Sequence, residues 1–421
     1  MRPRVIGLAR AVAGGWVALE LALVVVLTWS EGGLGAKVLR FVLLNAAVIV
    51  LAEVVFQIAT RLVTGRFYVR VPKLSFADIY MEPHPHITVV YKARFPTHPS
   101  MPVHYALSRG RRFRSIRMVT NNYRHLDGPG GDRDITVAKP PATVRVLCLG
   151  ESTTGNYLEM DGVVSSYPLE LEALLRARFP GRHVVVHNCG HGGWTSADIL
   201  IDFLLNLYDT DPDVVIIYHA YNDLAASLTP GFRSDYSHAR RNFGEVYHLY
   251  RKARYIPDVP LGFFNFVVNS LFPYLNPRFG VIEATSRGAP DLKGEFRGLE
   301  TYRRNIEHIV KVCQAGRIDV VLSTYAHLLY DEVRHSPVHL KYREGVLQEN
   351  EQILDVGRTL GVPVVDNFTL TPSEEKYFVD SIHLSPDGMR LLAQNFAEEV
   401  APLVGARFAV LPGDQDARRA T

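Results

Sequence analysis

The chain has 421 residues, of which 47% are hydrophobic and 21% are charged, and its formal net charge is +3. This length allows two or three domains. The small net charge and the lack of a basic nucleic-acid motif argue against a nucleic-acid partner, and three widely separated cysteines predict neither a disulfide framework nor a zinc site.

Two apolar segments lie near the N-terminus, residues 11–29 and 41–60. Each is about 20 residues long, which is enough to cross the hydrocarbon core of a bilayer as a helix. Glu20 and Glu53 favour an alternative, a pair of buried helices in a soluble domain, because a carboxylate is costly at mid-bilayer. The other residues are so strongly apolar that we predict an anchor of two transmembrane helices in residues 1–65.

The charges beside these segments bear on membrane topology. Basic residues precede the first segment and follow the second, whereas Glu31 and Lys37 lie between them. The positive-inside rule therefore favours the cytoplasmic side for the rest of the chain. Arg40, at the start of the second segment, weakens the contrast, and a single span would put the large domain on the other side. The basic flanks also predict contact with anionic membrane lipids.

Residues 66–140 are rich in Pro, His, Arg and aromatic residues and have no sustained periodicity. This composition predicts a juxtamembrane connector of short strands and loops. Its histidines lack the compact spacing of a ligand set, so we interpret them as scattered surface residues and predict no metal and no cofactor. These histidines are His84, His86, His98 and His104. The tail, residues 405–421, is expected to be partly disordered because its end is small and charged.

From residue 141 to residue 404, short apolar runs alternate with amphipathic helical patterns. Five continuous apolar runs separated by helices predict an α/β fold with a parallel sheet covered on both faces. Ligands bind beyond the carboxyl ends of the strands in such sheets. The expected strands span residues 144–149, 183–187, 214–218, 319–323 and 362–365, and the expected helices span residues 168–179, 196–208, 302–314, 342–360 and 386–403.

One connection is too long for an ordinary loop between a strand and a helix. Residues 225–297 follow the third expected strand, and we predict that they form an inserted cap. The aromatic residues of this insert suit the lining of an acyl or sugar site. They suit the core of a small packed subdomain equally well.

A serine and a distant Asp-His pair suggest nucleophilic catalysis. A hydroxyl needs an imidazole to take its proton and a carboxylate to hold that imidazole. Ser152 follows the first expected strand, and Asp380 and His383 lie just before the last expected helix. Taken alone, the serine suits a turn or a cap equally well, and the Asp-His pair suits a loop closure. Thr154 rules out the G-x-S-x-G nucleophile elbow.

Two further loops carry groups that suit an oxyanion. The glycine-rich segment 188–196 follows the second strand, where its backbone can turn sharply and direct an N–H at negative charge. No lysine follows these glycines, which argues against phosphate binding, and Thr195 or Ser196 suits a helix cap. After the third strand, the amide of Asn222 can donate to an oxyanion, and Asp223 can fix the loop by accepting backbone N–H groups. An ordinary turn is the alternative.

The ordered set of these motifs resembles the SGNH hydrolases, a subgroup of the GDSL esterase/lipase superfamily. The set is Gly-x-Ser, Asn-x-Gly-x-x-Gly, Asn-Asp and Asp-x-x-His, over about residues 141–404 without the insert. The resemblance implies a flavodoxin-like, doubly wound parallel sheet of five strands. It also implies the roles of the site residues: Ser152 as nucleophile, His383 as base, Asp380 as the residue that orients it, and Gly193 and Asn222 as oxyanion donors alongside the Ser152 N–H.

The chain departs from the family pattern at two positions. Glu151 stands where the family name has Asp, which does not touch the reacting groups, and Tyr221 stands where a glycine commonly precedes Asn-Asp, which narrows the expected site. The stretch 121–140 looks like the lead-in of membrane-tethered bacterial members. This likeness implies a multi-pass protein of a bacterial plasma or inner membrane.

The resulting hypothesis is a membrane-anchored serine esterase. Its expected substrate is an O-acyl ester, above all an O-acetyl ester, of a carbohydrate or lipid-linked glycan, hydrolysed through an acyl-enzyme. An O-acyltransferase that passes the acyl group to a glycan would use the same residues. A non-catalytic glycan-binding or assembly protein is the third alternative. The sequence leaves the oligomeric state open.

Overall fold

The computed structural model divides the chain into two compact units. The first comprises Met1–Ser75 and Tyr247–Gly288, and the second comprises Phe76–Val246 and Ala289–Thr421. The structure describes residues 21–65, 81–82, 84, 86–87, 90–97, 113–114, 118–128, 130, 132–160, 163–238 and 291–410.

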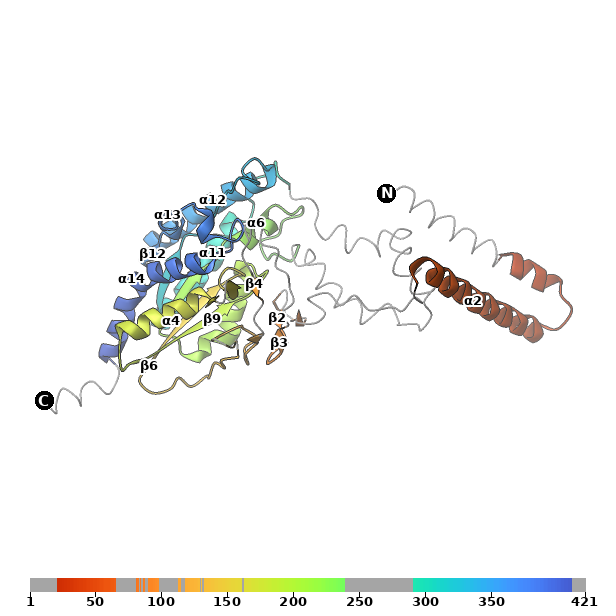
Figure 1. Cartoon of the computed structure of the whole chain (residues 1–421), viewed down its shortest axis with the longest axis horizontal. Coiled ribbons are helices and arrows are strands. Elements are labelled where there is room, and N and C mark those ends of the chain that lie inside the picture. The colour runs from red at the N-terminus through yellow and green to blue at the C-terminus, as the bar shows by residue number, and fades with distance from the viewer. Residues whose placement is uncertain are drawn as a thin grey trace. The chain divides into compact units, whose positions relative to one another are not determined.

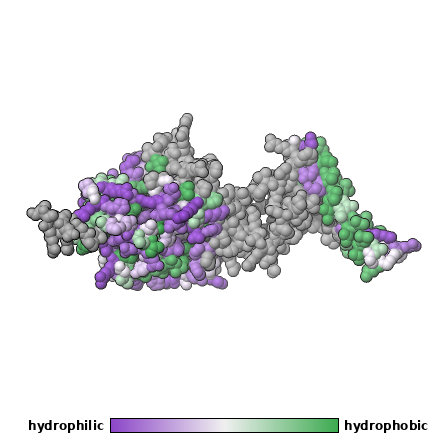
Figure 2. Space-filling view, turned by 90° about the horizontal axis from the view of Figure 1, so that it is seen from below, coloured by the Kyte–Doolittle hydropathy of each residue, from purple (hydrophilic) through white to green (hydrophobic). Residues whose placement is uncertain are grey.

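The described part of the first unit is helical. Helix α2 (Leu34–Thr64) ends at Gly65, whose left-handed backbone lets its N–H bond the carbonyl of Arg61. The stretch Leu34–Leu62 is long and apolar enough to cross a membrane, and none of its apolar window is buried. Figure 2 shows it as a largely hydrophobic surface. The predicted second span lies inside α2. Of the predicted first span, residues 21–29 are helical and the rest lies outside the described residues.

The second unit is built on a parallel sheet of five strands, which confirms the predicted fold class. The strand order is β12-β11-β10-β6-β9, the order of a flavodoxin-like doubly wound sheet. Gly150 pairs with both Gly190 and Tyr218, so three strands end at one level and deliver their loops to one edge. The strands are β6 (Thr143–Gly150), β9 (His183–Gly190), β10 (Val214–Tyr218), β11 (Asp319–Ser323) and β12 (Val364–Val365).

Helices cover both faces of this sheet (Figure 1). They are α4 (Tyr167–Arg178), α5 (Ser196–Asp202), α6 (Tyr221–Ser227), α11 (Leu299–Ala315), α12 (Pro337–Leu360), α13 (Asn367–Leu370) and α14 (Pro386–Val410). Helices α4 and α14 pack on one face with Cys148 of β6, and α5 and α11 pack on the other with Leu147. Because both faces are covered, all eight residues of β6 are buried, which explains its mostly apolar sequence. The charged exception is Arg145, whose buried guanidinium donates to the carbonyls of Thr136 and Thr210.

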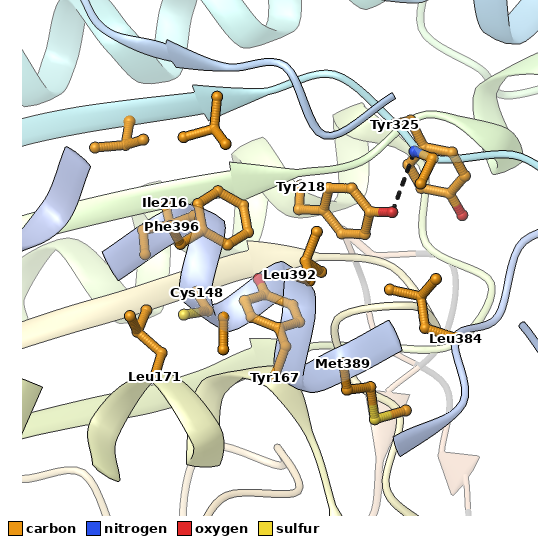
Figure 3. Close-up of a cluster of buried hydrophobic side chains, with 14 of the residues drawn as sticks. Cys148, Tyr167, Leu171, Ile216, Tyr218, Tyr325, Leu384, Met389, Leu392 and Phe396 are labelled. Carbon is orange, nitrogen blue, oxygen red and sulfur yellow. Dashed lines mark hydrogen bonds between the residues drawn. The ribbon is translucent and has the colours of Figure 1, made fainter. Parts of the chain in front are cut away.

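Aromatic rings fill the core beneath the carboxyl ends of the strands (Figure 3). Tyr218, the last residue of β10, stacks on Tyr325 with ring centroids 4.9 Å apart, and its hydroxyl accepts the backbone N–H of Ala326. Tyr167 of α4 and Phe396 of α14 pack together at 5.4 Å. This layer supports the loops that follow the strands.

All five predicted helices differ from the observed bounds by at least one residue, and two differ most. The helix expected over residues 196–208 is an α-helix only to Asp202, and a π-helical turn (Phe203–Leu207) and a 3-10 turn (Tyr208–Thr210) complete it. Helix α14 continues past the predicted domain end at 404, because the ring of Phe408 is buried against Phe179 with ring centroids 5.6 Å apart. Residues 405–410 are therefore helical, and residues 411–421 of the predicted tail lie outside the described residues.

The second unit begins at Phe76 and so includes the described part of the predicted connector. The buried carboxylate of Asp127 explains the attachment, because it accepts the N–H of Asn188 at 2.8 Å and lies 2.6 Å from Nδ1 of His187. Burial alone would raise the pKa of Asp127, but His187 and Arg133 hold it at about 2. The short strands outside the main sheet are β1 (Met81–Glu82), β2 (Val90–Tyr91), β3 (Pro96–Thr97), β4 (Phe113–Arg114), β5 (Met118–Val119), β7 (Leu158–Met160) and β8 (Val163–Ser165).

Most of the predicted cap lies outside the described residues, which include only residues 225–238 and 291–297 of it. Within this part, the hydroxyl of Tyr236 is buried and donates to Asp223 at 2.5 Å. The first part of the insert is thus fastened to α6. Of the connector histidines, His84 and His86 are described and their rings lie 6.0 Å apart, whereas His98 and His104 are outside the described residues.

Candidate active site

Ser152 lies in a tight turn directly after β6. The carbonyl of Glu151 accepts the N–H groups of Thr154 at 3.0 Å and Gly155 at 2.8 Å. A side chain at Gly150 would collide with the carbonyl oxygen of Tyr218 and the hydroxyl of Thr154, so only glycine allows β6 to end against its neighbour. The turn leaves Ser152 partly exposed at the edge of the sheet.

The structure brings the three predicted triad residues together. Ser152 Oγ lies 2.9 Å from Nε2 of His383, and Nδ1 of His383 lies 2.7 Å from Oδ2 of Asp380. The other carboxylate oxygen of Asp380 accepts the backbone N–H groups of Ile382 at 2.8 Å and His383 at 2.7 Å. The short loop between η5 (Glu375–Tyr377) and α14 therefore holds the carboxylate and the imidazole in a fixed mutual geometry.

The pKa values of this pair shift in the directions that suit a base and its partner. Burial lowers the pKa of His383, but the hydrogen bond and charge of Asp380, helped by Glu151, outweigh burial and raise it above 6.5. Burial raises the pKa of Asp380, but its hydrogen bonds to His383 and Ile382 hold the net value below 3.8. Near neutral pH, Asp380 is ionised, and His383 can take up a proton and hold it beside that negative charge.

The glycine-rich loop runs from β9 to α5 beside the serine. Gly193 has a φ of 82°, in the left-handed region that favours glycine. A methyl group on Gly192 would lie 4.0 Å from Cβ of Ser152, so this backbone passes directly beside the candidate nucleophile. The loop ends at Thr195, whose N–H and hydroxyl both donate to Asp198 and so cap α5, as the sequence indicated.

Asn222 lies in the first turn of α6, and a carboxylate orients it. Glu151 accepts the N–H groups of Tyr221 at 3.1 Å and Asn222 at 3.0 Å. Backbone N–H groups in the first turn of a helix have no partner within the helix, so the carboxylate supplies one. The Asn222 amide donates one hydrogen bond to the carbonyl of Trp194 at 3.0 Å. A primary amide has two N–H groups, so the second can donate to a ligand.

Asp223 joins the loops that follow β9 and β10. It accepts the backbone N–H of Ser196 at 2.7 Å and its hydroxyl at 2.6 Å, and lies 2.5 Å from Nε2 of His219. Asp223 was predicted to accept backbone N–H groups, and the group that it accepts is the N–H of Ser196, at the end of the loop after β9. The loop that carries Gly193 and the first turn of α6, which carries Asn222, are thus fastened to each other.

Sequence reasoning missed the roles of Glu151 and Tyr91. Glu151 was noted only as a departure from the family pattern, yet its buried carboxylate supports Asn222. An acidic residue directly after a buried strand was the available signal, because such a carboxylate needs partners. Tyr91 lies in the predicted connector, and its hydroxyl would lie 3.4 Å from a methyl group on Gly192. No pattern in the sequence links this tyrosine to the loop.

The described residues contain no group of three or more His, Cys, Asp or Glu side chains that could hold a metal ion. The three cysteines are free and buried. Burial raises the pKa of Cys148, Cys189 and Cys313, so these thiols are poor nucleophiles.

Comparisons with known proteins extend these observations. Residues 148–391 match the model of the GDSL-like lipase/acylhydrolase family. A lipase/acylhydrolase from Enterococcus faecalis is 19% identical, with 62% of this chain and 96% of that chain covered at a TM-score of 0.37. The acetylxylan esterase Axe2 from Geobacillus stearothermophilus is 16% identical, with 61% and 94% covered at 0.38. A GDSL-like lipase from Bacteroides thetaiotaomicron is 14% identical, with 61% and 87% covered at 0.34.

No curated protein matches the chain. The family model nevertheless covers more than half of it, and the matched region begins inside β6 and ends inside α14. The chain therefore belongs to the GDSL-like lipase/acylhydrolase family and is an ester hydrolase.

Proposed function

We propose that the protein is a serine esterase in which Ser152 is the nucleophile, His383 the general base and Asp380 the residue that orients the base. The observation that carries the proposal is the continuous chain of short contacts, 2.9 Å from the hydroxyl to the imidazole and 2.7 Å from the imidazole to the carboxylate. These are the distances that proton transfer requires.

The reaction follows from this arrangement. Ser152 Oγ attacks the ester carbonyl while Nε2 of His383 takes its proton, and Asp380 stabilises the imidazolium. Gly193 N–H, the second N–H of the Asn222 amide and the Ser152 N–H donate to the oxyanion. His383 then protonates the leaving alcohol. Water, activated by the same imidazole, releases the acyl group and restores the serine.

The substrate that we propose is an O-acyl ester, with acetyl as the acyl group, of a carbohydrate or lipid-linked glycan. The family supports the acyl ester. Aromatic rings beside the site support a carbohydrate, because Tyr221, which precedes Asn222, stacks on Tyr342 with ring centroids 4.7 Å apart and both rings are only partly buried. Partly exposed aromatic side chains at the edge of a site suit contact with the apolar faces of sugar rings.

We also propose an anchor of two transmembrane helices with the catalytic unit on the cytoplasmic side of a bacterial plasma membrane. Helix α2 supports the second of these spans, and the apolar sequence of residues 11–29 supports the first. The basic residues on either side of the pair support the orientation. An anchored enzyme would act on esters at the membrane surface.

The substitution Ser152→Ala tests the proposed nucleophile. We expect the turnover of p-nitrophenyl acetate by the purified full chain in detergent to fall by about 10⁴-fold or more, because the acyl-enzyme cannot form. Ser373→Ala, at an exposed loop serine, should keep the wild-type rate. Full activity of the Ser152→Ala protein would refute the assignment, and faster hydrolysis of long-chain than of acetyl esters would refute the acetyl group.

A further inference from the structure

His191 lies between β9 and the glycines beside Ser152, and it is buried and bonded through both ring nitrogens. Its Nδ1 lies 2.9 Å from the carbonyl oxygen of Gly192, and its Nε2 lies 3.0 Å from the backbone nitrogen of Tyr91. The ring is stacked between two aromatic rings, Trp194 with centroids 4.4 Å away and Tyr91 with centroids 3.9 Å away. These contacts leave the imidazole one orientation.

The partners of this imidazole also select one tautomer. Burial lowers the pKa of His191 to about 3, so the ring is neutral and has one N–H donor and one acceptor. The Tyr91 backbone N–H can only donate, so Nε2 must accept. The proton is therefore on Nδ1, which donates to the Gly192 carbonyl.

This hydrogen bond has a consequence for the next backbone N–H. The carbonyl of Gly192 and the N–H of Gly193 belong to one planar trans peptide, in which they point in opposite directions. A donor that fixes the carbonyl thereby fixes the direction of the N–H. On the proposed mechanism, this N–H is a donor to the oxyanion.

We propose that His191 is a positioning residue that aims the Gly193 N–H at the oxyanion, and that Tyr91 holds His191 in the required tautomer and orientation. The proposal rests on the proposed function of Ser152 and Gly193. Tyr91 precedes the family-matched region, which starts at residue 148, so a strand outside that region takes part in the geometry of the site.

The position of the Tyr91 side chain agrees with this role. A methyl group on Gly192 would lie 3.4 Å from the Tyr91 hydroxyl and 4.0 Å from Cβ of Ser152. The tyrosine therefore contacts the same face of the glycine loop that the serine faces. It also covers the side of the His191 ring that Trp194 does not cover, and so excludes water from the imidazole.

The experiment compares His191→Phe with His191→Asn in the full chain. Phenylalanine keeps the ring stack but removes both hydrogen bonds, whereas asparagine can place an N–H near the position of Nδ1. We expect His191→Phe to lower kcat for p-nitrophenyl acetate by about 10-fold to 100-fold with KM nearly unchanged, because a misplaced group costs about that much. His191→Asn should recover most of kcat.

A second variant tests the part of the proposal that concerns Tyr91. Tyr91→Ala removes the ring that covers His191, and we expect kcat to fall by about 10-fold with KM nearly unchanged. The matched control is Tyr123→Phe, which should stay within about twofold of wild type. Tyr123 lies near Arg145, toward the other end of β6.

The outcomes separate this proposal from the proposed function. Loss of activity in Ser152→Ala with wild-type rates in His191→Phe and Tyr91→Ala would overturn the positioning role and leave the nucleophile intact. Equal losses in His191→Phe and His191→Asn would also overturn it, since the donor would then not matter. Near-ultraviolet circular dichroism reports whether each variant is folded. If His191→Phe does not fold, His191→Gln, whose amide mimics Nε2, replaces it in the comparison.

Discussion

At the scale of single residues, His383 receives opposing influences. Burial favours its neutral form, and the carboxylate of Asp380 favours its charged form, with the carboxylate prevailing. A base must be neutral before it can accept a proton from the serine. The balance at this imidazole therefore sets the pH range in which the enzyme works.

The pH dependence of activity follows from the sign of this shift. Because the pKa of His383 is raised, kcat/KM should increase with pH through a midpoint above 6.5 and then level off. Asp380→Asn removes the charge that raises the pKa and leaves burial, so the remaining activity should titrate at a lower pH than wild type. The measurement is the rate of ester hydrolysis from pH 5 to pH 9. If the pH midpoint of Asp380→Asn equals that of wild type, Asp380 is not the cause of the raised pKa of His383.

The contacts of Glu151 are of a kind that a sequence does not predict. Its position directly before Ser152 was evident, but its partners are backbone N–H groups of a helix that begins at Tyr221. Backbone groups carry no side-chain signature, so no motif predicts which carboxylate will meet them. The triad was predictable because its chemistry restricts each position to one or two residue types.

At the scale of secondary-structure elements, the five strands were predictable, because a strand buried on both faces is mostly apolar. The end of α14 was not. The predicted helix ended at residue 403, close to Pro402 and Gly405, which are poor helix formers. Burial of Phe408 in a contact between residues far apart in the sequence overrides these local preferences, and a local pattern cannot reveal such a contact.

The last turns of α14 should therefore contribute to stability. Phe408→Ala removes a ring that is only 4% exposed, and we expect it to lower the free energy of unfolding by about 3 kcal/mol. Val410→Ala, at the exposed end of the same helix, should change it by less than about 0.5 kcal/mol. Urea unfolding followed by tyrosine and tryptophan fluorescence measures both. Similar midpoints for the two variants would show that the end of α14 contributes little.

At the scale of the whole molecule, the chain combines a helix with an apolar surface and an esterase unit. Helix α2 presents large hydrophobic side chains to its surroundings along its length, among them Leu43, Val50 and Ile58. An exposed apolar surface of this length needs a lipid or protein environment. The apolar composition made this helix predictable. The attachment of residues 118–128 and 132–135 to the sheet was not predictable, because it depends on polar contacts between distant residues, such as those of Asp127.

The proposed membrane anchor can be tested at the middle of α2. The double substitution Ala47→Arg and Val50→Arg places two charges near the centre of the apolar segment, each of which costs about 2.5 to 3.5 kcal/mol there. In a chain that lacks residues 1–30 and so keeps only this proposed span, we expect the two substitutions to move the protein from the membrane pellet to the supernatant after alkaline extraction. Leu34→Arg, at the helix end, should leave it in the pellet. Retention of the double variant in the pellet would count against a spanning α2.

Reporters that are active on only one side of the membrane, fused after residue 70, test the proposed orientation. We expect the cytoplasmic reporter to be active.

The small strand Val90–Tyr91 has a practical consequence for anyone who wishes to trim the gene to a water-soluble enzyme. A cut at residue 140, just before the first long strand, would remove the backbone amide and the ring that hold His191. The shortened protein would keep every residue of the family motifs but lose Tyr91, whose backbone N–H and ring contact His191. A cut upstream of Met81 would remove the proposed apolar anchor and keep Tyr91 and its contacts with His191.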